Sequence, residues 1–304
     1  MAKVKIRTGV VSVPGLELFY EDRGDVNAPA MVLIMGLGAQ LTVWPELLCE
    51  TLETKGYRVI RFDNRDIGLS SVVTMSKPLK TLENFIRSKL RMKIEAPYDL
   101  HDMAADTVLL LNQLKIQQAH IVGASMGGMI AQLLAATYPE RVLSLTSIMS
   151  NTNEPHLPTP DMRVLFHIAG ITGERVVDAA SAVRNRMTLW GMIKSPDHHI
   201  NESLVAERAE KSYKRSFRPE GAARHSLAVM ATGGFAANLK AIIAPTLVIH
   251  GNKDKLVPLA GGLDSARAIP GANLQIIDGM GHDLPDGLCP YYADLIIKNA
   301  NKAQ

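Results

Sequence analysis

One serine near the middle of the chain lies in a setting that could make it a nucleophile. The stretch "IVGASMGGMIAQLLAATYPERV" covers 121–142 and places Ser125 between an apolar segment and an apolar helical pattern. Gly123 and Gly127 complete a G-x-S-x-G pattern, in which a sharp strand-to-helix turn exposes the serine oxygen. Glycine is needed because a side chain at either position would collide with the neighbouring strand or helix. A tight packing turn without chemistry is the alternative interpretation, since the bare pattern also arises by chance.

A serine hydroxyl is a weak nucleophile without a base, and the base needs an acid to orient it. Asp254 in "VIHGNKDKLVP" and His282 in "IIDGMGHDLP" each follow an apolar segment late in the chain. Either residue alone fits a turn, a helix cap or a packed side chain equally well. The order Ser, Asp, His, with each residue at the end of a strand, predicts acyl transfer by Ser125, His282 and Asp254 together.

Backbone amides are expected to bind the negative oxygen that such a reaction creates. The Met126 N–H opens the helix after the serine and is one donor. The loop "LIMGLGAQ" supplies the second, for which we select the Leu37 N–H, next to Gly36. The alternative is that Leu37 merely packs.

Strands and helices alternate along the chain, which predicts a mostly parallel sheet with helices on both faces. The N-terminal residues read as an antiparallel hairpin at the sheet edge. The expected strands are 30–36, 57–63, 119–124, 142–149, 245–251 and 274–278, and the expected helices are 44–56, 99–115, 125–139, 262–270 and one from about 284. In "FDNRD", Asp63 and Arg65 are expected to be ion-paired loop anchors near the site.

Residues 151–240 read as a helical cap inserted into a core formed by 1–150 and 241–304. The segment opens with the proline-rich "NTNEPHLPTP" and shows no strand pattern, and 90 residues are too many for a structureless loop. Its twelve Lys or Arg exceed its nine Asp or Glu by three, which equals the net charge of the whole chain. Its apolar side chains could line an acyl pocket or form the core of the cap. The pocket candidates are Gly36, Met129, Phe166, Met187 and Trp190.

The chain resembles the α/β-hydrolase superfamily, and more narrowly its bacterial esterase branch with the aclacinomycin methylesterase-like proteins. The residues that carry the resemblance are "MGLGAQLTVW", "RFDNRDIGLSS", "DMAADTVLLLNQL", "VGASMGGMIAQ", "FRPEGAARH", "APTLVIHGNKDKLVP" and "GMGHDLP". The resemblance implies a catalytic triad of Ser125, Asp254 and His282, a helical cap and no cofactor. Many relatives carry His-Gly where this chain has Met35-Gly36, which changes the pocket wall but not the backbone donor.

These residues predict a serine carboxylesterase that hydrolyses short- to medium-chain carboxylic esters. A lactonase, a carbon–carbon bond hydrolase or a cofactor-free perhydrolase could use the same triad. A non-enzymatic receptor on the same fold is a further alternative, although no triad member is missing.

The composition bounds the partners. A net charge of +3 is too small for a nucleic-acid-binding surface, and no run of 18 apolar residues could span a membrane. No secretion signal is visible, and Cys49 and Cys289 have no redox or metal spacing, so we expect a cytoplasmic protein with reduced thiols and no metal. The expected partner is a small-molecule ester, and a homo-oligomer remains possible. The basic and apolar stretch 86–94 is expected to be a solvated face, whereas the role of 71–97 stays open.

Overall fold

An eight-stranded sheet forms the centre of the protein in the computed structural model, which describes residues 6–13, 15–74, 87, 94–168 and 170–303. The strand order is β1-β2-β4-β3-β5-β6-β7-β8, with β1 and β2 antiparallel at one edge and β3 to β8 parallel. The strands are β1 (Arg7–Val13), β2 (Leu16–Arg23), β3 (Ala30–Ile34), β4 (Arg58–Phe62), β5 (Ala119–Ala124), β6 (Val142–Ile148), β7 (Thr246–Gly251) and β8 (Asn273–Ile277). The predicted edge hairpin and parallel sheet are both confirmed.

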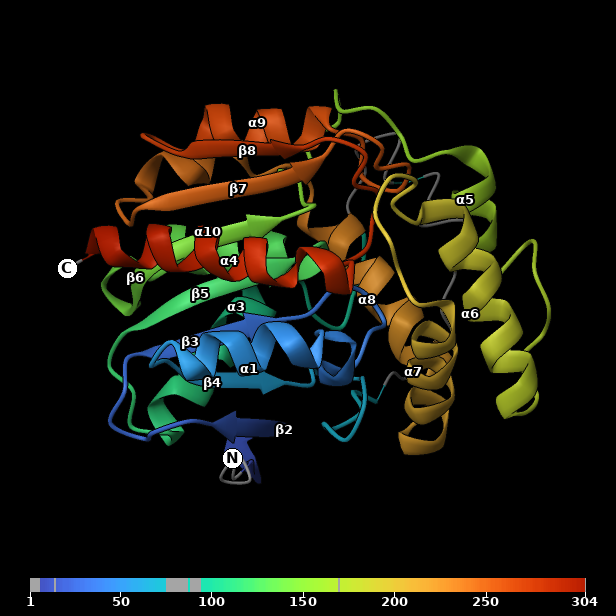
Figure 1. Ribbon diagram of the computed structural model, residues 1–304, viewed down its shortest axis with the longest axis horizontal. Helices are drawn as coiled ribbons and strands as arrows, with labels where there is room; N and C mark the ends of the chain where they lie inside the picture. The colour runs from blue at the N-terminus through green and yellow to red at the C-terminus, as the bar shows by residue number, and fades with distance from the viewer. Residues whose placement is uncertain (1–5, 14, 75–86, 88–93, 169, 304) are drawn as a thin grey trace.

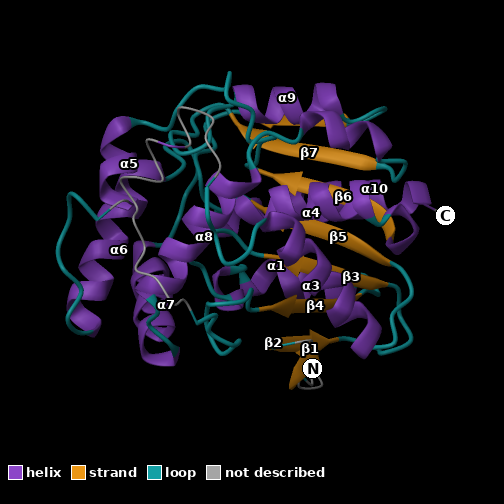
Figure 2. Cartoon of the chain, turned by 180° about the vertical axis from the view of Figure 1, so that it is seen from behind, coloured by secondary structure: helices purple, strands orange, loops and turns teal. Residues whose placement is uncertain are grey.

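Helices cover the two faces of this sheet (Figures 1 and 2). Helices α1 (Glu46–Thr54) and α10 (Cys289–Ala300) bury Leu48 and Tyr292 against one face. Helices α3 (Leu100–Gln113) and α4 (Met126–Thr137) bury their apolar sides against the other face, near α9 (Ala260–Ala268). Central strands such as β3 and β5 are buried at every position, which is why they read as continuous apolar runs.

Several boundaries differ from the sequence prediction by a few residues, and two of these differences have local reasons. Strand β3 ends at Ile34 rather than at Gly36, because the chain turns there into the loop that faces Ser125. The last helix begins at Cys289 rather than near Leu284, after the short 3-10 turn Asp286–Leu288. Its first turn contains a proline, whose missing N–H costs nothing at that position.

In the described part of 151–240, helices are the only regular elements. They are α5 (Met162–Ile168), α6 (Ala179–Ile193), α7 (Glu202–Arg215), α8 (Pro219–Thr232) and the 3-10 helix η3 (Ala236–Ala241). Figure 1 shows α5, α6 and α7 beside the end of the sheet toward which the parallel strands point. Each of α3 and α6 starts with a capping box, at Asp99 and Asp178.

Within the part of the chain that the structure describes, no helix is long and apolar enough to cross a bilayer. Most of the basic stretch 86–94, namely residue 86 and residues 88–93, lies outside the described residues.

Candidate active site

Ser125 lies in a strained turn between β5 and α4. Its φ of 56° falls in the left-handed region, which a residue with a side chain rarely adopts. A Cβ on Gly123 would come within 2.1 Å of the Gly127 carbonyl oxygen, and a Cβ on Gly127 within 2.1 Å of the Ile34 carbonyl oxygen. Close packing of β5, α4 and β3 therefore requires glycine at both positions and holds the serine in the turn.

His282 follows β8 and reaches the serine. Its Nε2 lies 2.9 Å from Ser125 Oγ, and its Nδ1 lies 2.7 Å from Asp254 Oδ2. Nδ1 donates to the carboxylate oxygen of Asp254, which leaves Nε2 as the acceptor for the serine hydroxyl.

Asp254 follows β7 and is held by the backbone. Its Oδ1 accepts from the Leu256 N–H at 2.9 Å and the Val257 N–H at 2.7 Å, which leaves Oδ2 for His282. The structure thus brings together the three residues predicted as a triad, on loops at the carboxyl ends of β5, β7 and β8.

The two predicted oxyanion donors flank the serine. Met126 is the first residue of α4, and a Cβ on Gly36 would lie 3.0 Å from the Ser125 Cβ, so the loop after β3 passes directly beside the serine. Neither the Leu37 N–H nor the Met126 N–H donates a hydrogen bond to another described residue. Their role as donors to an oxygen bound next to Ser125 stays a prediction.

The predicted pocket residues lie in different environments. Gly36 is beside Ser125, whereas Met129 is buried on α4 among the residues that pack against the sheet. Phe166 on α5 is 40% exposed, and Met187 on α6 is half-buried. Trp190, near the end of α6, is buried, and its Nε1 lies 3.2 Å from Asp283 Oδ2. A shared acyl pocket of these residues stays a prediction.

Sequence reasoning missed a hydrogen-bonded link between α6 and the loop that carries His282. Asp283 accepts from the Ser195 hydroxyl at 2.5 Å as well as from Trp190, and Ser195 Oγ accepts from the Gly281 N–H at 2.8 Å. The His282 N–H donates to the Ile193 carbonyl at 2.7 Å. Burial raises the pKa of Asp283, although its hydrogen bonds act in the opposite direction.

Ion pairs join the loop after β4 to its surroundings. Asp63 is fully buried and pairs with Arg215 of α7 at 2.7 Å, and Arg65 pairs with Asp106 of α3 at 2.7 Å. The prediction of ion-paired anchors is confirmed. The next acidic residue, Asp66, pairs with Arg224 of α8 at 2.7 Å, which the sequence did not indicate.

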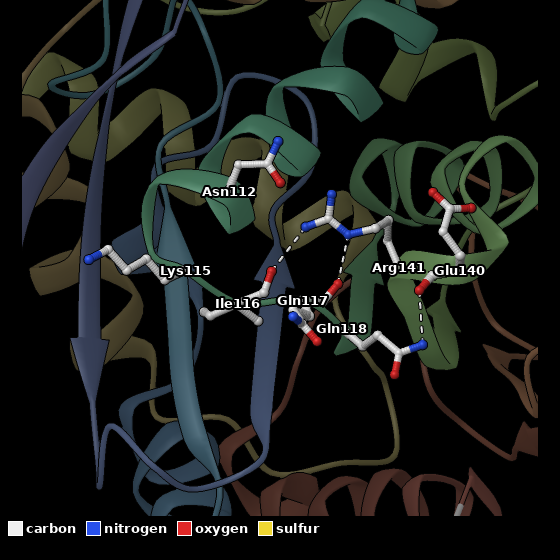
Figure 3. A pocket seen from close by; sticks show the side chains of 7 residues that line it. All are labelled: Asn112, Lys115, Ile116, Gln117, Gln118, Glu140 and Arg141. Carbon is white, nitrogen blue, oxygen red and sulfur yellow. Dashed lines mark hydrogen bonds between the residues drawn. The ribbon is translucent and has the colours of Figure 1, made fainter.

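A surface hollow lies at the other end of the sheet. It has a volume of about 620 Å³ and is lined by Asn112, Lys115, Ile116, Gln117, Gln118, Glu140 and Arg141 (Figure 3). The side chains of Arg141 and Gln118 donate hydrogen bonds to backbone carbonyls there, as the dashed lines show. Because β5 and β6 begin beside this hollow and Ser125 follows the end of β5, it is separate from the site at Ser125. Among the described residues, no group of three His, Cys, Asp or Glu could hold a metal ion.

Comparison with known proteins agrees with this architecture. Residues 29–286 match the family described as the alpha/beta hydrolase fold. The chain belongs to this family. The resemblance inferred from the motifs is therefore confirmed, and the protein is a hydrolase with an esterase-like relative.

The similar proteins carry the names of hydrolases with different substrates. Rhodomycin D methylesterase of Streptomyces peucetius is 28% identical, with 91% of this chain and 93% of that protein covered. A putative carbamate hydrolase of Variovorax paradoxus is 27% identical, with 88% of this chain and 90% of that protein covered. The enol-lactonase structure from Burkholderia xenovorans superposes with a TM-score of 0.74 at 23% identity, covering 96% of this chain and all of that one. The last likeness shows the fold alone.

Proposed function

We propose that this hydrolase is a serine carboxylesterase that cleaves short- to medium-chain carboxylic esters through an acyl-enzyme. The observation that carries the proposal is the continuous hydrogen-bonded chain from Ser125 Oγ to His282 and from His282 to Asp254, at 2.9 and 2.7 Å. These distances fall in the range that a nucleophile, a base and an orienting acid require.

In the first half of the reaction, Ser125 Oγ attacks the ester carbonyl carbon while its proton passes to His282 Nε2. The carbonyl oxygen becomes negative and accepts hydrogen bonds from the Leu37 and Met126 amides. Asp254 holds the ring and stabilises its charged form. The tetrahedral intermediate collapses, the carbon–oxygen bond to the alcohol breaks, and His282 gives its proton to the leaving oxygen.

In the second half, water attacks the acyl carbon and gives its proton to His282. The acid is released when the bond to Ser125 Oγ breaks, and the proton returns from His282 to that oxygen. Each amide donor is worth about 3 kcal/mol of transition-state stabilisation in enzymes of this type. No step requires a cofactor.

The likeness to a methylesterase over nine tenths of both chains supports an ester rather than another acyl substrate. The likeness to a carbamate hydrolase keeps carbamates as a second candidate, because the same attack on a carbonyl carbon cleaves both.

A panel of p-nitrophenyl esters of increasing acyl length, with an aryl carbamate, a lactone and a diketone beside it, tests the substrate class. We expect the highest kcat/KM on an ester of short or medium acyl length. A phosphonate probe should label Ser125 in the same protein, as read by mass spectrometry of the digested chain. Labelling at another residue, or turnover of the diketone alone, would contradict the proposal.

A further inference from the structure

His225 of α8 joins the loop that carries the Leu37 N–H to the loop after β4. Its side chain is fully buried, its Nδ1 lies 3.2 Å from the Gly38 nitrogen, and its Nε2 lies 2.7 Å from the Arg65 carbonyl oxygen. The Gly38 N–H can only donate, so Nδ1 is the unprotonated acceptor and Nε2 carries the proton that is donated to Arg65. One neutral tautomer satisfies both contacts.

The loop that His225 contacts is a tight turn. The Ala39 N–H donates to the Gly36 carbonyl at 3.2 Å, and Gly38, the third residue of the turn, has a φ of +66°. Glycine is favoured at that position because a positive φ is required. A Cβ on Gly38 would lie 2.9 Å from the Ala222 Cβ, so α8 packs directly against the turn.

The far end of this loop is also held by the segment 151–240. Gln40 donates through Nε2 to the Ser212 and Ser216 carbonyls, at 2.7 Å each, and accepts from Arg215 at 2.7 Å. The residue on one side of Leu37, Gly36, is confined by Ser125, and the residue on the other side, Gly38, is confined by His225. The Gly38 N–H is already used, which leaves the Leu37 N–H as the donor for an oxyanion.

We propose that His225 is a positioning residue that accepts the Gly38 N–H and so holds the Leu37 N–H where it stabilises the oxyanion formed at Ser125. The inference rests on the proposed function, since the orientation of this amide affects the rate only if an oxyanion forms there. His225 itself touches no reacting atom.

Two substitutions separate the two contacts of the ring. The side-chain oxygen of His225→Asn can replace Nδ1 as the acceptor for Gly38, but it loses the bond to Arg65. The side-chain amide of His225→Gln can replace the Nε2 donor to Arg65, but it loses the bond from Gly38. Each variant thus loses one hydrogen bond, and only the second loses the contact that positions the turn. Ser226→Ala is the matched control, because among the described residues the Ser226 hydroxyl bonds only to the Ala222 carbonyl of its own helix.

We expect His225→Gln to lower kcat roughly ten- to hundredfold, somewhat less than the loss of a whole oxyanion donor. KM should stay within about threefold, because the lost stabilisation is specific to the transition state. Affinity for a trifluoromethyl ketone should fall by the same factor as kcat, since Ser125 adds to its carbonyl carbon and leaves an oxyanion. His225→Asn and Ser226→Ala should keep kcat within about threefold of wild type.

Equal losses of kcat in the Asn and Gln variants, or a lower kcat with unchanged ketone affinity, would overturn the inference while leaving the esterase intact. A wild-type protein that neither turns over esters nor reacts with the phosphonate probe would overturn the proposed function as well. If His225→Gln does not fold, Ala222→Val tests the same contact by pressing α8 against the turn. It should lower kcat and ketone affinity together, and an unchanged kcat in a folded Ala222→Val protein would count against the inference.

Discussion

Substitution of Trp190 by phenylalanine should lower activity on every ester without changing which acyl length is preferred. The indole Nε1 of Trp190 donates to Asp283, the residue after His282, and the indole is buried. Phenylalanine keeps most of the apolar ring and removes the donor. A side chain that anchors the His282 loop should affect all substrates equally, whereas a side chain that lines an acyl pocket should affect them according to length.

The expected loss of stability and activity in Trp190→Phe follows from the hydrogen bonds that the variant loses and those that it keeps. A hydrogen bond to a charged group is worth about 1.5–3 kcal/mol, so the free energy of unfolding should fall by about that amount. If all of it were lost from the transition state, kcat/KM would fall roughly ten- to hundredfold. The His282 N–H and the Gly281 N–H still bond to Ile193 and Ser195, so we expect the fall to stay near the lower end.

The assay combines urea unfolding with kcat/KM for p-nitrophenyl esters of increasing acyl length. Trp190→Phe is compared with Asp283→Ala and with the double variant, so that the space left by the smaller ring cancels in the cycle. Phe166→Ala is the control on α5, where the side chain is 40% exposed. A changed order of acyl lengths with an unchanged best rate, and no coupling between Trp190 and Asp283, would refute the anchoring role and favour a pocket wall.

Three further outcomes are expected. Ser125→Ala should leave the fold intact and reduce esterase activity to a small residue; a variant that kept a tenth of wild-type activity would show that the nucleophile is another residue. Activity should persist in EDTA, because the sequence offers no ligand spacing for a metal, and a loss that one added divalent ion reversed would contradict this. Burial lowers the pKa of His225 to about 4, so the folded protein binds fewer protons than the unfolded chain between pH 6.5 and 4, and stability falls as the pH drops through this window. Between pH 7 and pH 5, this group lowers the free energy of unfolding by about 2 kcal/mol. Urea unfolding of His225→Asn should therefore depend on pH less steeply by that amount, because the raised pKa values of Asp63 and Asp106 act alike in both proteins. Equal pH dependence in the two proteins would argue against a lowered pKa of His225.

Features that depend on residues close together in the sequence could be predicted. Strand β5 and the turn at Ser125 are set by a short apolar run and by glycines two residues on either side of the serine. The positions of Asp254 and His282 at the ends of strands could be predicted because each follows a strand that is itself visible as an apolar run. The paired Asp63 could be expected to be an anchor, but its partner Arg215 lies in another segment and could not be named.

The remaining contacts join residues that lie far apart in the sequence and whose types alone do not indicate a partner. His225 and Gly38 are 187 positions apart, and Trp190 and Asp283 are 93 positions apart. In the sequence, His225, Ser195 and Asp283 cannot be told from solvated polar residues. Only the packing of α6 and α8 against the two loops decides which of them is held in place.

These contacts change what the segment 151–240 is expected to do. A cap that only selects substrates needs apolar walls, and such walls discriminate by about 1–3 kcal/mol per methylene. This segment also supplies the acceptor for the Gly38 N–H, the acceptor for the His282 N–H and the donors to Asp283. The loops that carry the proposed base and the proposed oxyanion donor therefore depend on it for their positions. Because the same helices contribute to both tasks, a change that reshapes the wall should also shift the loops and so lower the rate on every ester.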